Sequence, residues 1–246
     1  MRAAIPNTLT LTNLFCGCMC LICIFTQQIQ LLPVFFGLAL LMDYVDGFVA
    51  RALKVSSDLG KELDSLADMV SFGVVPGALF YTLLNNTQNV SNANFSQPDT
   101  LWGLIGFLVT LFSCLRLAKF NLDDRQADAF IGLNTPSCTT FVMGISLCVH
   151  YQIYDLQTII SNFYLLVALV LVLSYLLISE IPMFSFKFKS LDWKTNRFRF
   201  AFIAWVLLSL LLLPLGLAMA AVILSYIFFS IVLWIGGYIS IPKRVK

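Results

Sequence analysis

Charged residues are scarce in this chain of 246 residues, and their scarcity excludes most soluble folds. Asp, Glu, Lys and Arg make up 11% of the sequence, against about 25% in an ordinary soluble domain. Hydrophobic residues make up 59%, and the mean hydropathy is +0.89. A soluble fold could not bury this much apolar surface, so the sequence predicts an integral membrane protein. The apolar runs are long and nearly uncharged, which indicates helices rather than the alternating strands of a barrel.

Histidine is represented only by His150, which we expect to be an interfacial side chain rather than a base. The net charge of +2 is small, and basic residues do not alternate with aromatic ones in the manner that binds a nucleic acid strand. We therefore expect no nucleic acid partner. Four of the seven cysteines lie in the first apolar run. A metal or redox site is one interpretation of them, but small apolar residues of a membrane helix are the simpler one.

The apolar runs predict an all-α integral membrane protein with about eight transmembrane helices. The candidate spans are residues 8–25, 30–52, 59–84, 99–119, 135–153, 158–178, 200–213 and 215–239. We expect residues 1–180 to form a membrane core of about six helices. Residues 181–246 would then add a basic cytoplasmic loop and two C-terminal transmembrane helices.

Lysine and arginine are absent from every second loop, and this absence predicts the orientation. With the N-terminus in the cytoplasm and eight spans, all 15 Lys and Arg residues fall on the cytoplasmic side. The opposite segments, around Gln27, 85–99, 151–157 and Pro214, contain none. Because positive residues are retained on the cytoplasmic side of a membrane, we expect both termini there. A bacterial inner membrane is the expected location.

Four aspartates lie close together in this apolar chain. Asp43 and Asp46 are three residues apart, and Asp64 and Asp68 are four apart, so each pair shares one face of a helix. The predicted topology places both pairs at matching depth, at the cytoplasmic ends of neighbouring helices. An unpaired carboxylate at membrane depth costs about 2.5–3.5 kcal/mol or more. The cluster therefore predicts a site for a hard divalent cation, Mg2+ or Mn2+.

Small and basic residues accompany the aspartates at regular spacing. Gly47 and Ala50 share the side of the helix that carries Asp43 and Asp46, and they leave room for a planar ligand. Arg51 follows within one turn and can bind a phosphate through two hydrogen bonds. Carboxylates, a divalent metal, small residues and an arginine together favour phosphoryl transfer. Structural ion pairs with the neighbouring basic residues are the alternative, but the acids outnumber the bases.

The pattern Asp-x2-Asp-Gly-x2-Ala-Arg-x8-Gly-x3-Asp-x3-Asp resembles the signature of the CDP-alcohol phosphotransferase family. Its fixed positions are Asp43, Asp46, Gly47, Ala50, Arg51, Gly60, Asp64 and Asp68. The resemblance implies integral membrane enzymes that use a CDP-linked donor, need a divalent metal and release CMP near the cytoplasmic face. It also implies a homodimer.

The resemblance implies a role for each of these residues. The four aspartates would hold one or two metals, and Asp68 would also take the proton from the acceptor hydroxyl. Residues that would bind the CDP donor are Pro6, Asn7, Thr8, Gly47, Ala50, Arg51, Gly60 and Lys61.

Flanking segments are similar to the phosphatidylserine synthases within the family. These segments are residues 63–76, 116–121 and 130–136, where Asn134 stands in place of a usual proline. The implied reaction transfers a phosphatidyl group from CDP-diacylglycerol to L-serine. Arg116 and Lys119 would bind the serine carboxylate, and the carbonyl of Asn121 would bind the ammonium group.

Two alternatives stay open at this stage. Glycerol 3-phosphate, inositol phosphate or choline could serve as the acceptor in the same chemistry, although a phosphorylated acceptor would favour a denser basic pocket. A cation-coupled transporter is more remote, because it would distribute acids through the membrane depth or show an internal repeat.

Overall fold

The computed structural model describes residues 4–55, 57–87, 98–123, 130–184 and 193–239. The helices are α1 (Ala4–Phe25), η1 (Ile29–Leu31), α2 (Leu32–Ala52), α3 (Asp58–Asp68), η2 (Met69–Val74), α4 (Val75–Thr87), η3 (Pro98–Phe107), α5 (Leu108–Leu122), α6 (Thr135–His150), η5 (Ile153–Asp155), α7 (Leu156–Ile160), α8 (Phe163–Ile178), α9 (Trp193–Leu212) and α10 (Leu215–Ile235). The strands β1 (Phe130–Ile131) and β2 (Pro182–Met183) form one short antiparallel pair. The all-α prediction is confirmed.

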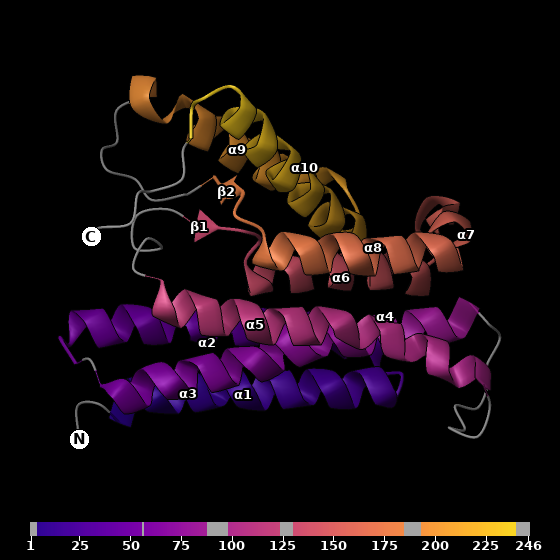
Figure 1. Cartoon of the computed structure of the whole chain (residues 1–246), viewed down its shortest axis with the longest axis horizontal. Helices are drawn as coiled ribbons and strands as arrows, with labels where there is room; N and C mark the ends of the chain where they lie inside the picture. Colours follow the sequence, from indigo (N-terminus) through magenta and orange to yellow (C-terminus); the bar gives the residue numbers. More distant parts are fainter. Residues whose placement is uncertain (1–3, 56, 88–97, 124–129, 185–192, 240–246) are drawn as a thin grey trace.

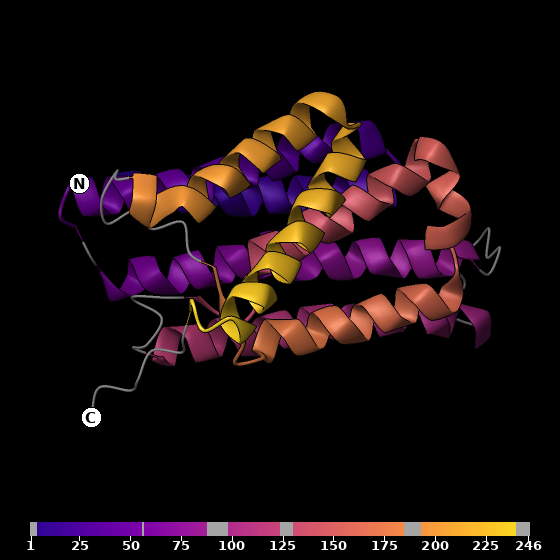
Figure 2. The ribbon, with the colours of Figure 1, turned by 90° about the horizontal axis from the view of Figure 1, so that it is seen from above.

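The helices are stacked in layers. α1 to α5 form one layer, α6 and α8 lie on it, α10 covers α6, and α9 packs against α10 (Figure 1). Seen from above, α9 and α10 run away from a shared turn and cross the helices beneath them (Figure 2). The start of α1 and the end of α10 lie toward the same end of the bundle as the junction of α2 and α3 (Figure 1). This arrangement agrees with termini on one side of a membrane, which stays a prediction.

Within the described residues, five helical segments are long and apolar enough to cross a membrane, which supports an integral membrane protein. They are Ala4–Phe25, Ile29–Ala52, Asp58–Thr87, Leu101–Leu122 and Leu215–Ile235. A sixth candidate is bent by 86° between Ile153–Ile160 and Phe163–Ile178, so the predicted span over 158–178 is broken near its start. α6 has 16 residues, which is short for a span, and the count of eight stays a prediction.

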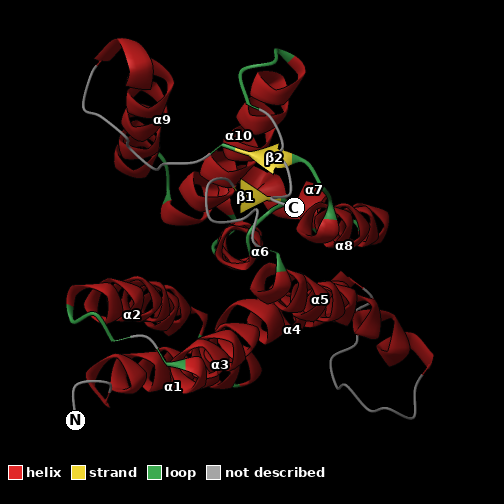
Figure 3. Cartoon of the chain, turned by 60° about the vertical axis from the view of Figure 1, so that its left-hand side comes forward, coloured by secondary structure: helices red, strands yellow, loops and turns green. Residues whose placement is uncertain are grey.

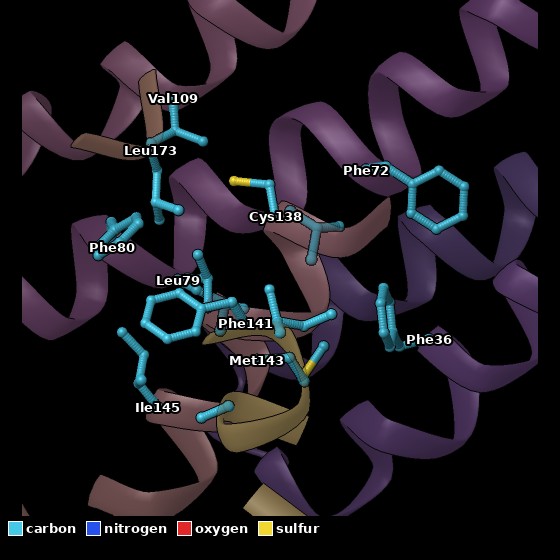
Figure 4. Packing of buried hydrophobic residues seen from close by; sticks show 14 of the residues in the cluster. Phe36, Phe72, Leu79, Phe80, Val109, Cys138, Phe141, Met143, Ile145 and Leu173 are labelled. Carbon is cyan, nitrogen blue, oxygen red and sulfur yellow. The ribbon is translucent and has the colours of Figure 1, made fainter. Parts of the chain in front are cut away.

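The main apolar core lies where α6 meets α2, η2, α4 and α8. Figure 4 shows Phe36, Phe72 and Phe141 among its side chains. Phe36 and Phe72 meet edge to face, with ring centroids 6.1 Å apart. The core therefore ties the first helical layer to α6 just beside the end of α3.

α10 makes a close backbone contact with α6 through two glycines. A Cβ on Gly144 would lie 2.7 Å from the carbonyl oxygen of Gly216, and a Cβ on Gly216 would lie 2.7 Å from Cβ of Leu147. Neither distance is compatible with a larger side chain, so the small residues allow the helices to approach closely. This contact fixes α10 against the membrane core.

The segment before α6 is held without a proline at position 134. Asn134 caps α6, and its Oδ1 accepts a hydrogen bond of 2.7 Å from the backbone N–H of Ser137. Gly132 has a φ of +73°, and its N–H donates to the carbonyl of Ile181 at 2.8 Å. The cap and the glycine turn supply the order that a proline would otherwise give.

Candidate active site

The four aspartates meet between the second halves of α2 and α3, toward the end of the bundle turned forward in Figure 3. Carboxylate oxygens of Asp43, Asp64 and Asp68 all lie within 4.8 Å of one another. Asp46 is 5% exposed and interacts electrostatically with the other three. The spacing within each helix places each pair on one face, and α1, which packs against both α2 and α3, holds the two pairs near each other.

The carboxylate cluster fits a divalent metal. None of the four aspartates forms an ion pair with a Lys or Arg among the residues that the structure describes. Oδ1 of Asp64 is buried and accepts no hydrogen bond from the part of the chain that the structure describes. Arg51, the nearest basic residue of the motif, donates instead from Nε to the carbonyl of Gly47 at 3.0 Å. Crowded carboxylates that form no ion pair with a described Lys or Arg favour a bound cation, and an all-oxygen donor set suits Mg2+ or Mn2+.

α1 adds two polar residues that were not among the predicted site residues. The hydroxyl of Thr10 donates to Oδ2 of Asp46 and lies 3.1 Å from the carbonyl oxygen of Pro6. Nδ2 of Asn13 donates to Oδ1 of Asp68 at 3.2 Å. The available signal was the three-residue spacing of Asn7, Thr10 and Asn13 in an apolar run, which places them along one side of a helix.

A π-helical turn, η2, follows Asp68 directly. The hydroxyl of Ser71 donates to the carbonyl of Asn13 at 3.0 Å, which ties η2 to α1. Thr110 of α5 donates to the carbonyl of Gly73 at 2.8 Å, and Thr139 of α6 donates to the carbonyl of Phe72 at 2.9 Å. A π-turn frees carbonyls from the regular helical ladder, and π-turns are frequent at functional sites. Three neighbouring helices thus hold the turn that positions Asp68.

A cavity of about 390 Å³ opens beside the carboxylates, between α1, α2 and α3. Its lining includes the predicted donor-binding residues Pro6, Asn7, Gly47, Ala50, Arg51, Gly60 and Lys61. Thr10, Asp46, Lys54, Val55, Ser57 and Asp64 complete the lining. Thr8 is not among the lining residues; its hydroxyl donates to the carbonyl of Ala4 at 2.8 Å and its side chain is exposed. The donor residues that the motif selects are therefore neighbours in space.

Small residues keep this cavity open. A Cβ on Gly47 would meet no atom within 4 Å, so any side chain there would project into free space beside the lining residues. Gly60 lies in the first turn of α3, and its N–H donates to Oγ of Ser57, the capping residue, at 3.0 Å. The N-terminal end of α3 faces the cavity together with the exposed Lys61, which favours a negatively charged ligand.

Arg116 of α5 is buried close to the carboxylates. Its side chain is 6% exposed, it forms no hydrogen bond with any residue that the structure describes, and its Nε is buried without a partner. It interacts electrostatically with Asp68, and its guanidinium carbon lies 5.8 Å from the ring centroid of Phe120. A buried guanidinium without hydrogen bonds is a candidate site for an anionic ligand group.

The other two predicted acceptor residues lie at the exposed end of α5. Lys119 and Asn121 are both exposed. Nδ2 of Asn121 donates to Oγ of Ser65 on α3 at 2.8 Å. The structure therefore brings Arg116 to the carboxylates and leaves Lys119 and Asn121 nearer the surface.

α10 also reaches the neighbourhood of Arg116. Tyr226 is 5% exposed and interacts electrostatically with Arg116. Its hydroxyl donates to the carbonyl of Phe184 at 3.0 Å, and Oγ of Ser230 accepts from the N–H of Phe184 at 3.1 Å. The C-terminal helices thus hold the segment that follows β2 and border the side of the site where Arg116 lies.

The fold and the carboxylate site define a membrane-embedded family, and sequence comparison identifies it. A profile of the CDP-alcohol phosphatidyltransferase family matches residues 3–176. The chain belongs to this family. α9 and α10 lie outside the matched residues.

Several named enzymes are similar to this chain. The CDP-diacylglycerol–serine O-phosphatidyltransferase of Bacillus subtilis is 34% identical over 136 residues, which cover 54% of this chain and 69% of the relative. The enzyme of the same name from Helicobacter pylori is 27% identical over 238 residues, covering 94% and 90%. An archaetidylserine synthase of Methanothermobacter thermautotrophicus is 28% identical over 151 residues, covering 61% and 60%.

Proposed function

We propose that this protein transfers a phosphatidyl group from CDP-diacylglycerol to the hydroxyl of L-serine and releases CMP. The observation that carries this proposal is the junction of α2 and α3, where a carboxylate cluster adjoins a cavity lined by the family motif. The names of the relatives support serine as the acceptor. The buried Arg116 supports an acceptor that carries a carboxylate.

We assign the donor to the cavity between α1, α2 and α3. Its cytidine would lie against Gly47, Ala50 and Gly60, which line the cavity, and an added Cβ on Gly47 would meet no atom within 4 Å. The pyrophosphate would lie between the aspartates and the basic side chains Arg51 and Lys61. A divalent metal held by Asp43, Asp46, Asp64 and Asp68 would neutralise developing charge on the phosphate oxygens.

The acceptor would enter from the side of Arg116. Asp68 takes the proton of the serine hydroxyl, and Asn13 leaves one of its carboxylate oxygens unshared for this purpose. The serine oxygen forms a bond to the phosphorus of the phosphatidyl group, and the bond from that phosphorus to CMP breaks. Arg116 binds the serine carboxylate during this step, while Lys119 and Asn121 line the approach from the surface.

We also propose the setting in which this reaction takes place. The basic residues Arg51, Lys61 and Lys119 lie on segments at the same end of the bundle as the aspartates, which supports a cytoplasm-facing site. A bacterial inner membrane is the proposed location, since two of the relatives come from bacteria. A homodimer is proposed from the family resemblance, and cross-linking in native membranes tests it.

An acceptor panel tests the proposed function. Purified protein in mixed micelles receives CDP-diacylglycerol and Mg2+ or Mn2+ with serine, glycerol 3-phosphate, inositol phosphate or choline in parallel. We expect CMP release with serine and formation of phosphatidylserine. CMP release with another acceptor and none with serine would refute serine as the substrate while leaving the chemistry of the donor intact.

A further inference from the structure

Asn13 of α1 holds an unusual position beside the candidate base. Its side chain is fully buried, with 0% exposure, near the middle of a membrane helix. Its amide nitrogen donates to Oδ1 of Asp68. Because an ionised carboxylate can only accept, the nitrogen must face Asp68 and the amide oxygen must face away from that contact.

The amide oxygen of Asn13 has no partner. Oδ1 is buried and accepts no hydrogen bond from any residue that the structure describes. A buried acceptor left unsatisfied costs about 1–3 kcal/mol. The backbone around it is fixed, because Ser71 donates to the carbonyl of Asn13 and Gly17 packs against Ser71 one turn further along α1. The side chain therefore has little freedom to turn to solvent, and a ligand is needed to satisfy it.

We propose that Oδ1 of Asn13 accepts a hydrogen bond from the ammonium group of the amino-acid acceptor. This inference rests on the proposed function. An amide oxygen is only an acceptor, so it binds ammonium and repels carboxylate. In serine the ammonium and carboxylate groups share the carbon next to the one that bears the hydroxyl. The residues that bind these three groups must therefore be neighbours.

The neighbourhood of Asp68 meets this requirement. Asp68 faces the hydroxyl, Asn13 is hydrogen-bonded to Asp68, and Arg116 interacts electrostatically with Asp68 from α5. Asn13 thus offers a hydrogen-bond acceptor to the substrate's ammonium group, and Arg116 offers a cation to its carboxylate. Both residues lie beside the same base. Asn121 is less suited to the ammonium group, because it is exposed and its amide already contacts Ser65. Asn13 becomes the specificity-determining residue for the amine.

The test compares two acceptors that differ only at the amine. L-serine and 3-hydroxypropanoate share the hydroxyl and the carboxylate, but 3-hydroxypropanoate lacks the ammonium group. CMP release is measured with both acceptors for the wild type and for Asn13→Ala. Where turnover of 3-hydroxypropanoate is too slow to measure, its inhibition constant against serine replaces it. We expect kcat/KM for serine to fall about 10- to 100-fold more than that for 3-hydroxypropanoate.

Two further variants separate recognition from structure. Asn13→Asp keeps an acceptor oxygen but loses the N–H that positions Asp68, so turnover falls with both acceptors while the preference for serine is retained. If Asn13→Ala gives no folded protein, the serine preference of Asn13→Asp tests the inference in its place. Asn85→Ala is the matched control, because Asn85 is 5% exposed and has a buried, unpartnered Oδ1 on α4. Asn85→Ala should leave the ratio of kcat/KM for serine to kcat/KM for 3-hydroxypropanoate unchanged.

Three results would overturn the inference. Equal losses for both acceptors in Asn13→Ala would leave Asn13 as a positioning residue for Asp68 alone. A higher Mg2+ or Mn2+ requirement with unchanged preference would make Oδ1 a metal ligand. A loss of preference in Asn13→Asp would show that an acceptor oxygen at this position is not sufficient. In all three cases the wild type still converts serine; a wild type that does not would refute the proposed function itself.

Discussion

Replacing Gly17 by alanine should separate α1 from η2 and misplace the candidate base. A Cβ on Gly17 would lie 2.4 Å from Oγ of Ser71 and 2.9 Å from Cα of Ser71. The hydroxyl can rotate away, but the Cα belongs to the backbone of η2. Ordinary van der Waals contact begins near 3.4 Å, so the two backbones must move apart by at least about half an ångström.

The expected magnitude follows from this displacement. Overpacking of this kind destabilises a protein by about 1–3 kcal/mol, partly offset by the better helix propensity of alanine, about 0.5–1 kcal/mol. The same movement stretches the bonds from Ser71 to Asn13 and from Asn13 to Asp68. A misplacement of about 1 Å can cost on the order of 100-fold in rate, so half that distance predicts a kcat on the order of 10-fold lower.

The assay pairs thermal melting in detergent with CMP release at saturating serine and donor. Gly37→Ala is the matched control, because Gly37 is an exposed glycine of α2 whose added Cβ meets no atom within 4 Å. It should melt at or above the wild-type temperature and keep full turnover. Gly17→Ala should melt lower and turn over more slowly. Indistinguishable behaviour of the two variants would refute the close α1–η2 contact and its control of Asp68.

Three other predictions concern the reaction itself. Asp68→Asn should lower kcat by about 10²- to 10⁴-fold while the donor still binds; full activity would remove Asp68 as the base. Arg116→Ala should raise the serine KM by about 10- to 100-fold and leave the donor KM unchanged. Equal effects of Arg116→Ala on both constants would indicate a structural role. Chelation should abolish CMP release, and Mg2+ or Mn2+ should restore it; activity in excess chelator would contradict a metal held by the aspartates.

The part of the fold that could be read from the sequence is the part that depends on hydropathy. Long uncharged runs predicted membrane helices, because the bilayer imposes their length and composition. The breaks within the runs could not be read. The π-turn at Met69–Val74 lies in largely apolar sequence. The 3-10 helix at Pro98–Phe107 and the bend before Phe163 fall at short polar segments, but these segments do not by themselves predict the local geometry. Tertiary hydrogen bonds, such as those from Thr110 and Thr139, stabilise the π-turn. Hydropathy does not predict such bonds.

The candidate site also has a part that the sequence predicts and a part that it does not. Its donor side is built from residues close in sequence, since α2 and α3 follow each other and share one junction. Helical spacing and one turn between helices were enough to bring the carboxylates and small residues together. Asn13 and Asp68 are 55 positions apart, and their contact depends on how α1 packs against η2. The spacing of Asn7, Thr10 and Asn13 places Asn13 on a polar side of its helix, but it does not indicate which residue 55 positions away lies opposite.

The residues proposed for the donor and the cation proposed for the acceptor lie on different helices. The donor cavity and the carboxylates lie on α1, α2 and α3, whereas the cation proposed for the acceptor carboxylate lies on α5. Asn13 is the residue at which the two sides meet, since it is bonded to the base and its free oxygen is available to the acceptor. A change at Asn13 or Arg116 can therefore alter which alcohol is accepted without altering the residues that line the nucleotide cavity. The donor motif is thus compatible with many acceptors, and acceptor identity must be sought on α1 and α5.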